Sequence, residues 1–232
     1  IAPPEGSIQI IMVKLLALAV LHKSKQESKE QPVFIALAED LSSFGWFTRG
    51  AIQEHIRFGF RTVCQRTDFG LRQTVRMEKF DYVVHAHVRS DGLCGIAITD
   101  EEYPTQAVFG GISQMLSEIL KASKQSVDRA KDTKHNVSAS IELHPSKDSF
   151  ETPTFLKSML SRFQDPKEAD KAHKIQQTIK DVKDVLQKNV VQLLERGETL
   201  DKLMEDTKDL SYTSKAFHDR AARMNYWCCR IY

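Results

Sequence analysis

The C-terminal quarter of this chain constrains its structure most, because its pattern is that of one long helix. Asp165-Pro166 is typical of a helix start, with Asp at the N-cap and Pro at the first helical position. Beyond Pro166 the sequence contains no further proline and one glycine, Gly197. This predicts a helix of roughly 60 residues, about 90 Å long at 1.5 Å per residue. A chain of this size cannot easily bury such a helix in its own core, so we expect it to bind partner helices.

Apolar residues recur along this helix at alternating steps of three and four, which gives the 3.5-residue repeat of a coiled coil. Polar and charged residues fill the positions between them. We take as coiled-coil layers Ile175, Ile179, Val182, Leu186, Asn189, Leu193, Leu200, Leu203, Leu210, Phe217 and Met224. The repeat by itself leaves open a generic homodimeric coiled coil.

One charged residue, Arg196, lies near the middle of this apolar stripe. A buried guanidinium is costly unless its five donors find acceptors. Two identical helices would place Arg against Arg, so the stripe favours a mixed assembly whose other helices supply glutamine or similar acceptors. Such a polar layer also fixes the register of the helices.

The run 193–203 (LLERGETLDKL) resembles the centre of the synaptobrevin-like R-SNARE motif. The resemblance implies that Arg196 forms the ionic central layer with three glutamines from glutamine-type SNARE helices. It also implies that residues 165–227 zip into a four-helix bundle that drives vesicle docking and fusion. The alternative is a non-fusogenic longin-like trafficking adaptor whose coiled coil is a scaffold.

The preceding region, residues 12–164, is expected to form an α+β domain. Apolar runs and alternating patterns predict strands at 12–21, 31–38, 71–79, 82–89 and 93–99. Helices are expected from Phe44, with Ser42-Ser43 as the N-cap, from Tyr103-Pro104, and over 155–163. The order β-β-α-β-β-β-α-α, with a mobile linker before the last helix, favours an antiparallel sheet between helices. Residues 1–11 precede a natural start at Met12 and are set aside as an upstream remnant or disordered leader.

The helix predicted from Phe44 has two apolar faces. One contains Ile52, Ile56, Phe60 and Val63, and the roughly opposite one contains Phe47, Ala51 and Phe58. Either both faces lie in a thick core, or the second face is a groove that receives the chain's own helix or a lipid. The pieces 40–49 and 100–107 are similar to helix starts of longin domains. That resemblance implies an autoinhibitory fold-back in which Phe58 acts as a latch.

The tail, residues 228–232, offers a membrane anchor. Cys229 occupies the cysteine of a C-terminal prenylation box, and Cys228 could carry a second lipid. Arg230 and Tyr232 depart from the usual box and leave the prenyl type open. One lipid chain anchors reversibly and two hold firmly. This tail resembles that of lipid-anchored longin SNAREs, and the alternative is an unmodified thiol pair.

Composition and motifs exclude other classes. The net charge of +2 gives no reason to expect nucleic acid, and four scattered cysteines do not form a disulfide framework. The longest apolar stretch, 10–21, is too short to span a bilayer. His85 and His87 lack a third metal ligand, and no phosphate loop or nucleophile motif is present. We therefore expect no enzyme and no cofactor, but a protein that is cytoplasmic and peripheral on the cytosolic face of endomembranes.

Overall fold

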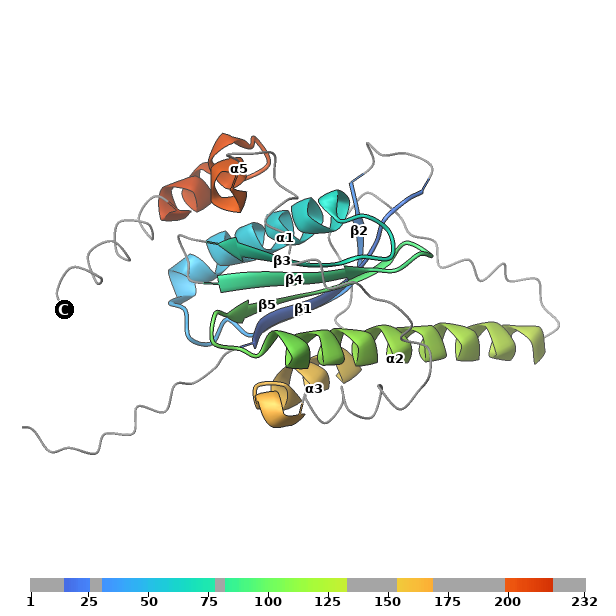
Figure 1. The fold of residues 1–232 in the computed structure, drawn as a ribbon. Coiled ribbons are helices and arrows are strands. Elements are labelled where there is room, and N and C mark those ends of the chain that lie inside the picture. Colours follow the sequence, from blue (N-terminus) through green and yellow to red (C-terminus); the bar gives the residue numbers. More distant parts are fainter. Residues whose placement is uncertain (1–14, 26–30, 78–81, 133–153, 169–198, 219–232) are drawn as a thin grey trace, which may run out of the picture.

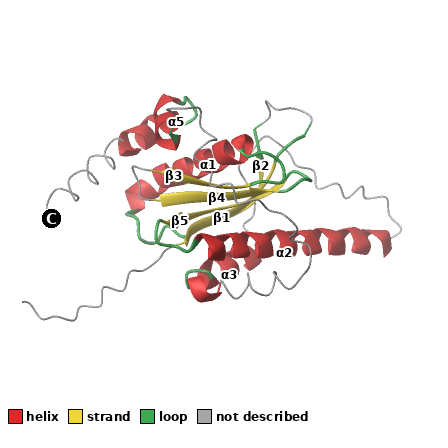
Figure 2. Cartoon of the chain, in the orientation of Figure 1, coloured by secondary structure: helices red, strands yellow, loops and turns green. Residues whose placement is uncertain are grey.

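The fold is described by a computed structural model that covers residues 15–25, 31–77, 82–132, 154–168 and 199–218. The strands and helices follow the predicted order β-β-α-β-β-β-α-α, which confirms the α+β expectation (Figures 1 and 2). The strands are β1 (Leu15–His22), β2 (Val33–Glu39), β3 (Arg72–Met77), β4 (Tyr82–Val88) and β5 (Leu93–Asp100). The helices are η1 (Trp46–Thr48), α1 (Arg49–Arg66), α2 (Thr105–Asp132), α3 (Thr154–Arg162) and α5 (Leu200–Asp206).

The five strands form one antiparallel sheet in the order β2-β1-β5-β4-β3. The central strands β1 and β5 are buried along all but their last residue. This continuous burial explains why their sequences are apolar runs rather than alternating patterns: helices cover both faces of the sheet.

Two apolar cores lie on the two sides of the sheet, as the layers in Figure 1 show. On one side α1 packs the predicted face, and its side chains are at most 6% exposed: Ile52, Ile56, Phe60 and Val63. On the other side α2 and α3 pack together, and the Tyr103 hydroxyl before α2 donates to the Phe163 carbonyl oxygen at 2.7 Å. The sheet therefore lies between α1 and the α2–α3 pair.

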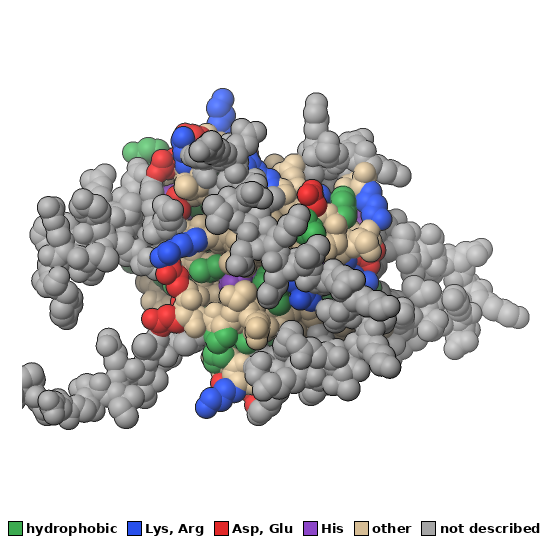
Figure 3. Space-filling view, viewed as in Figure 1, with side chains coloured by type: hydrophobic (Ala, Val, Ile, Leu, Met, Phe, Trp, Pro, Cys, Tyr) green, Lys and Arg blue, Asp and Glu red, His purple; other side chains and the backbone are tan. Residues whose placement is uncertain are grey.

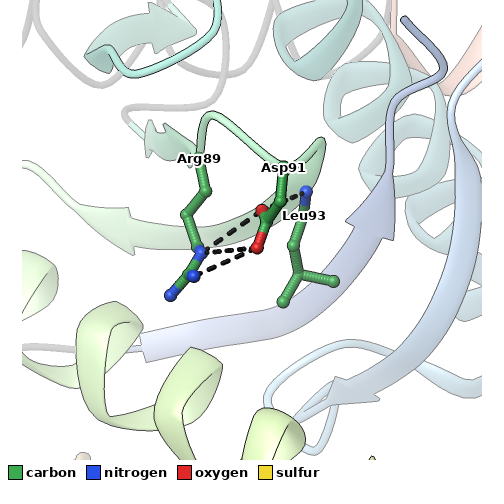
Figure 4. A network of polar contacts seen from close by, with 3 residues as sticks. All are labelled: Arg89, Asp91 and Leu93. Carbon is green, nitrogen blue, oxygen red and sulfur yellow. Dashed lines mark hydrogen bonds and ion pairs between the residues drawn. The ribbon is translucent and has the colours of Figure 1, made fainter.

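The hairpin between β4 and β5 turns at Asp91-Gly92, as predicted. Gly92 has a φ of 93°, in the region that glycine adopts without strain. Asp91 accepts from the backbone N–H of Leu93 at 3.1 Å and from the Arg89 guanidinium at 3.2 Å (Figure 4). These contacts fix the turn and, with it, the register of the two strands.

The start of α1 differs from the prediction. Ser42 and Ser43 lie in a turn, and the α-helix begins at Arg49 after the short η1. Gly45 is the reason, because its backbone is extended, with a ψ of 145°, and interrupts the helical run. Ser42 therefore does not cap the helix, and its N–H donates to the Asp40 carboxylate instead.

The C-terminal helix is also not continuous where the structure describes it. In the C-terminal segment (residues 199–218), α5 ends at Asp206, and Thr207 is extended with a ψ of 148°. Residues 212–218 form a second helical stretch. The expectation of one uninterrupted helix is therefore wrong for this segment in this state.

Several expected features lie outside the described residues. These are the segment 1–11, the layers Ile175, Ile179, Val182, Leu186, Asn189, Leu193 and Met224, the central Arg196, and the tail cysteines Cys228 and Cys229. Within the described ranges, no helix combines the length and the apolar character that crossing a membrane requires.

Candidate functional site: the contact between α1 and the C-terminal segment

The C-terminal segment packs against the outer face of α1, as the ribbon in Figure 1 shows. Leu200 and Met204 are 0% exposed and Leu210 is 6% exposed, and all three belong to the same core cluster as the inner face of α1. Phe217 is half-buried against that cluster. The segment therefore extends the core on the α1 side of the sheet, across about twenty residues of its sequence.

Gly59 on α1 faces two apolar side chains of α5. A Cβ added at Gly59 would lie 3.5 Å from Met204 Cε and 3.7 Å from Leu200 Cδ2. A methyl group would therefore fit at ordinary contact distance, whereas a longer side chain would have to displace α5. A small residue at this position therefore allows Leu200 and Met204 to pack on α1.

The predicted groove residues occupy different surroundings. Phe58 is half-buried against the core cluster and lines an open groove of ≈ 590 Å³ between α1 and the C-terminal segment, together with Leu203 and Leu210. Ala51 is buried, at 7% exposure. Phe47 belongs to η1 rather than α1, and its side chain is 88% exposed. Of the three residues, Phe58 is the one that lines the contact.

A carboxylate on α1 holds the start of the terminal helical stretch. Glu54 Oε2 accepts from the Ser211 backbone N–H at 2.9 Å and from the Ser214 hydroxyl at 2.7 Å. Partial burial by itself raises the pKa of Glu54, but the hydrogen bonds from Ser214 and Ser211 outweigh it and leave that pKa below its ordinary value. Glu54 thereby acts as an N-terminal cap supplied by another element.

Two buried histidines meet across the same contact. The rings of His55 on α1 and His218 on the terminal helical stretch have centroids 5.5 Å apart in an edge-to-face arrangement. His218 Nε2 lies 3.6 Å from an oxygen of Asp201 on α5. Burial lowers the pKa of His55, and the hydrogen bond to the Ala51 carbonyl and the charge of Glu54 only partly oppose this.

The sequence pattern predicted only part of this site. Leu200, Leu203, Leu210 and Phe217 were expected as layers for foreign helices, and the structure places them on or beside α1. Glu54, His55, Gly59, Asp201, Met204 and His218 were missed. A signal for two of them was present, because His55 and Gly59 follow Ala51 at steps of four and so share its helix face. Glu54, by contrast, acts through a partner 157 residues away, and no local pattern reports such a pair.

The described residues around the site include charged side chains of both signs. Figure 3 shows both acidic and basic described side chains on one face of the molecule. Among the described residues, no group of three His, Cys, Asp or Glu side chains could hold a metal ion. The arrangement is that of an intramolecular docking surface.

Comparisons with known proteins match both halves of the chain. Residues 41–141 match the regulated-SNARE-like (longin) domain model, and residues 171–230 match the synaptobrevin model. The VAMP-like protein YKT61 of Arabidopsis thaliana is 37% identical over 219 residues, which cover 94% of this chain and 100% of that relative. The synaptobrevin homolog YKT6 of Yarrowia lipolytica is 37% identical, covering 93% and 98%. The synaptobrevin homolog YKT6 of Saccharomyces cerevisiae is 33% identical over 202 residues, which cover 87% of this chain and 93% of that relative.

Proposed function

Because this chain belongs to the longin-type R-SNAREs of the synaptobrevin family, which act in vesicle fusion, we propose that its N-terminal domain holds its own SNARE motif in a closed, inactive form. The observation that carries this proposal is the burial of Leu200 and Leu210 against the α1 side of the longin domain. Both residues are expected layers of the fusion bundle. A layer side chain that packs on α1 is not available to a partner helix, so the two assemblies compete.

The active form is a four-helix bundle with three glutamine-type SNARE helices. In it, the layers from Ile175 to Met224 pack on foreign helices, and Arg196 donates to three glutamine oxygens in the central layer. A fully buried Leu contributes about 1.5–3 kcal/mol, so many layers together outweigh the few that the closed form buries. The closed form therefore delays assembly without preventing it.

The chain is attached to the cytosolic face of endomembranes through lipids on Cys228 and Cys229. Zippering can draw two membranes together only if each chain is fixed to its membrane, and a pair of lipids provides firm attachment. We expect the intact mass of the native protein to exceed the sequence mass by one or two lipid groups on these cysteines. Unmodified thiols at both positions would contradict this part of the proposal.

The test of the closed form is Phe58→Glu in the full-length chain. Glutamate here would remove the apolar contact of Phe58 with the core cluster and put a charge into the groove that Leu203 and Leu210 line, so we expect the C-terminal segment to detach. Detachment should raise the membrane-bound fraction in cells and speed the assembly of purified chain with glutamine-type SNARE helices.

Phe47→Glu is the matched control, because it makes the same chemical change at an aromatic side chain that is already 88% exposed. It should leave both quantities at the wild-type level. If Phe58→Glu folds but behaves like Phe47→Glu, the longin domain does not hold the motif. If the chain associates with itself and ignores glutamine-type helices, it is a scaffold rather than a fusion SNARE.

A further inference from the structure

We propose that the free edge of β2 binds an extended peptide of another protein, which pairs with this strand as a sixth strand of the sheet. In the described structure β2 pairs with β1 alone, so its other edge has no strand beside it. A groove of ≈ 540 Å³ lies at that edge, between α1 and α3. We call it the β2 groove, and its lining includes Leu37 and Glu39 of β2, Gln53 and Arg57 of α1, and Lys157 and Ser161 of α3. These residues all belong to the longin domain, so the inference goes beyond the closed form and does not depend on it.

The backbone of β2 directs hydrogen-bonding groups toward this groove. The N–H of Asp40 donates to the Leu16 carbonyl oxygen on β1 at 2.8 Å. Successive residues of a strand direct their backbone groups to opposite edges, so Ala38 also faces β1, whereas Leu37 and Glu39 face away from it. Among the described residues, nothing pairs with the backbone of Leu37 or Glu39 on the outer edge. Their N–H and C=O groups are those that an added strand uses.

The shape of the edge favours a single extended chain over a second sheet. Leu37 and Ala38 are each 3% exposed, and they pack in the core clusters on the α1 side and the α3 side respectively. The edge is therefore recessed between the two helices. A second copy of this sheet carries the same helices beside its own edge, so the helices would meet before the strands did. A peptide has only side chains above and below its backbone and can enter the groove.

Glu39 determines which side chain the peptide should carry. Its Oε2 accepts from Gln53 Nε2 at 2.9 Å, whereas its Oε1 is buried and accepts no hydrogen bond from a described residue. Burial raises the pKa of Glu39, and the hydrogen bond from Gln53 and the charge of Arg57 only partly oppose this. The terminal torsion of a glutamate is soft, so the carboxylate can turn one oxygen toward a donor in the groove. A lysine or arginine facing α1 therefore suits this site.

The opposite wall of the β2 groove suits an apolar residue. Leu160 on α3 lines it and is 5% exposed, and Ser161 beside it is small and exposed. Side chains of a strand alternate between its two faces, so the neighbours of the basic residue point toward α3. The expected ligand is an extended segment in which a basic residue on one face alternates with apolar residues on the other.

The probe is a short synthetic peptide with blocked ends, in which threonine and valine alternate and lysine replaces the central threonine. One control peptide carries glutamate in place of the lysine. A second control keeps all side chains but has N-methylated backbone nitrogens, which cannot donate to β2. The measurement is amide exchange of the full-length protein by NMR, with and without peptide.

The amides of Leu37 and Glu39 should exchange up to about a hundredfold more slowly when the free peptide is at about 100 times its Kd, because exchange then requires the peptide to leave. The amide of Ala38, which already faces β1, should change far less. The glutamate peptide should bind more weakly than the lysine peptide, and Glu39→Gln should reduce this preference.

Ser161→Tyr fills the groove from α3 and should abolish the slowing by the peptide. Ser158→Tyr is the matched control, because Ser158 is exposed on the same helix and does not line the groove. Amides of β4 and β5 report whether each variant is folded. If Ser161→Tyr does not fold, the N-methylated peptide on the wild-type chain decides instead.

Four outcomes overturn the inference. The first is that the lysine peptide leaves the exchange of Leu37 and Glu39 unchanged, and the second is that the N-methylated peptide slows it equally. The third is that the glutamate peptide binds as tightly as the lysine peptide, or that folded Ser161→Tyr behaves like Ser158→Tyr. The fourth is that these amides become protected without peptide as the protein concentration rises, which would make a second copy of the chain the occupant.

Discussion

Met204 offers a way to weaken the closed form without touching the fusion bundle. Its side chain is 0% exposed, and its Cε lies 3.5 Å from where a Cβ on Gly59 would be. The layer pattern, however, places Leu203 on the coiled-coil stripe and Met204 beside it. Met204→Ala should therefore remove a contact that only the closed form makes.

The size of the effect follows from the buried volume. Truncating a fully buried Met to Ala costs about 2–5 kcal/mol in a rigid core. A docked segment can partly relax, so we take about 2 kcal/mol, which corresponds to roughly a 30-fold shift from closed to open chains at 1.4 kcal/mol per tenfold. The assay is hydrogen exchange of the outer face of α1 in the full-length protein, alongside the melting temperature of the mixed bundle.

Leu203→Ala is the matched control, because Leu203 is only half-buried in the closed form and is an expected layer. It should lower the melting temperature of the mixed bundle while changing α1 protection less than Met204→Ala does. Met204 does not hold the closed form if Met204→Ala leaves α1 as protected as in wild type, and it is not specific to the closed form if the variant weakens the bundle as much as Leu203→Ala does.

Two further predictions concern α1 and the sheet. Gly59→Ala should stabilise the protein by up to about 1 kcal/mol, because alanine favours the helix and its methyl group meets Met204 at ordinary contact distance. Gly59→Phe, by contrast, should detach α5. The measurement is the unfolding midpoint, and equal midpoints for the two variants would contradict both expectations. Burial lowers the pKa of His85 to about 4, where its neutral ring lies between the hydroxyls of Thr74 and Thr99. A lowered histidine pKa means that stability is complete above the ordinary value of about 6.5 and is lost as pH falls toward 4, by about 3 kcal/mol. Urea unfolding should show a smaller loss in His85→Gln, and an equal loss in both proteins would argue against His85 as the cause.

The sequence predicted the longin sheet well because the signals there are local. Strands buried on both faces must be apolar throughout, and β1 and β5 are. The turn at Asp91-Gly92 could be predicted because an Asp-Gly pair is typical of tight hairpin turns, and the observed φ of 93° at Gly92 is one that glycine adopts without strain. The start of α1 was missed because two serines looked like a cap, while the extended backbone of Gly45 decided where the helix begins.

The docking contact could be predicted only in part. The face of α1 that carries Ala51 and Phe58 was visible from helical periodicity, as was the apolar stripe on the C-terminal helix. The break at Thr207 was missed because no proline or glycine marks it and the apolar repeat continues through it to Leu210 and Phe217, although Asp206, Thr207 and Asp209 are weak helix formers. The pairing of Glu54 with Ser211 and Ser214 joins residues that no spacing relates.

The sequence by itself determined the five strands, the inner face of α1 and the repeat of layers around Arg196. In each case the pattern of apolar residues along a short stretch of chain indicates which side chains are buried. Only the tertiary structure decided which surface Leu200 and Leu210 pack on. An apolar stripe specifies that it must be buried but not by what, since the hydrophobic effect has no direction. In this chain the packing site is set by residues far along the sequence from the C-terminal segment. They are the small residue Gly59, the carboxylate of Glu54 and the ring of His55.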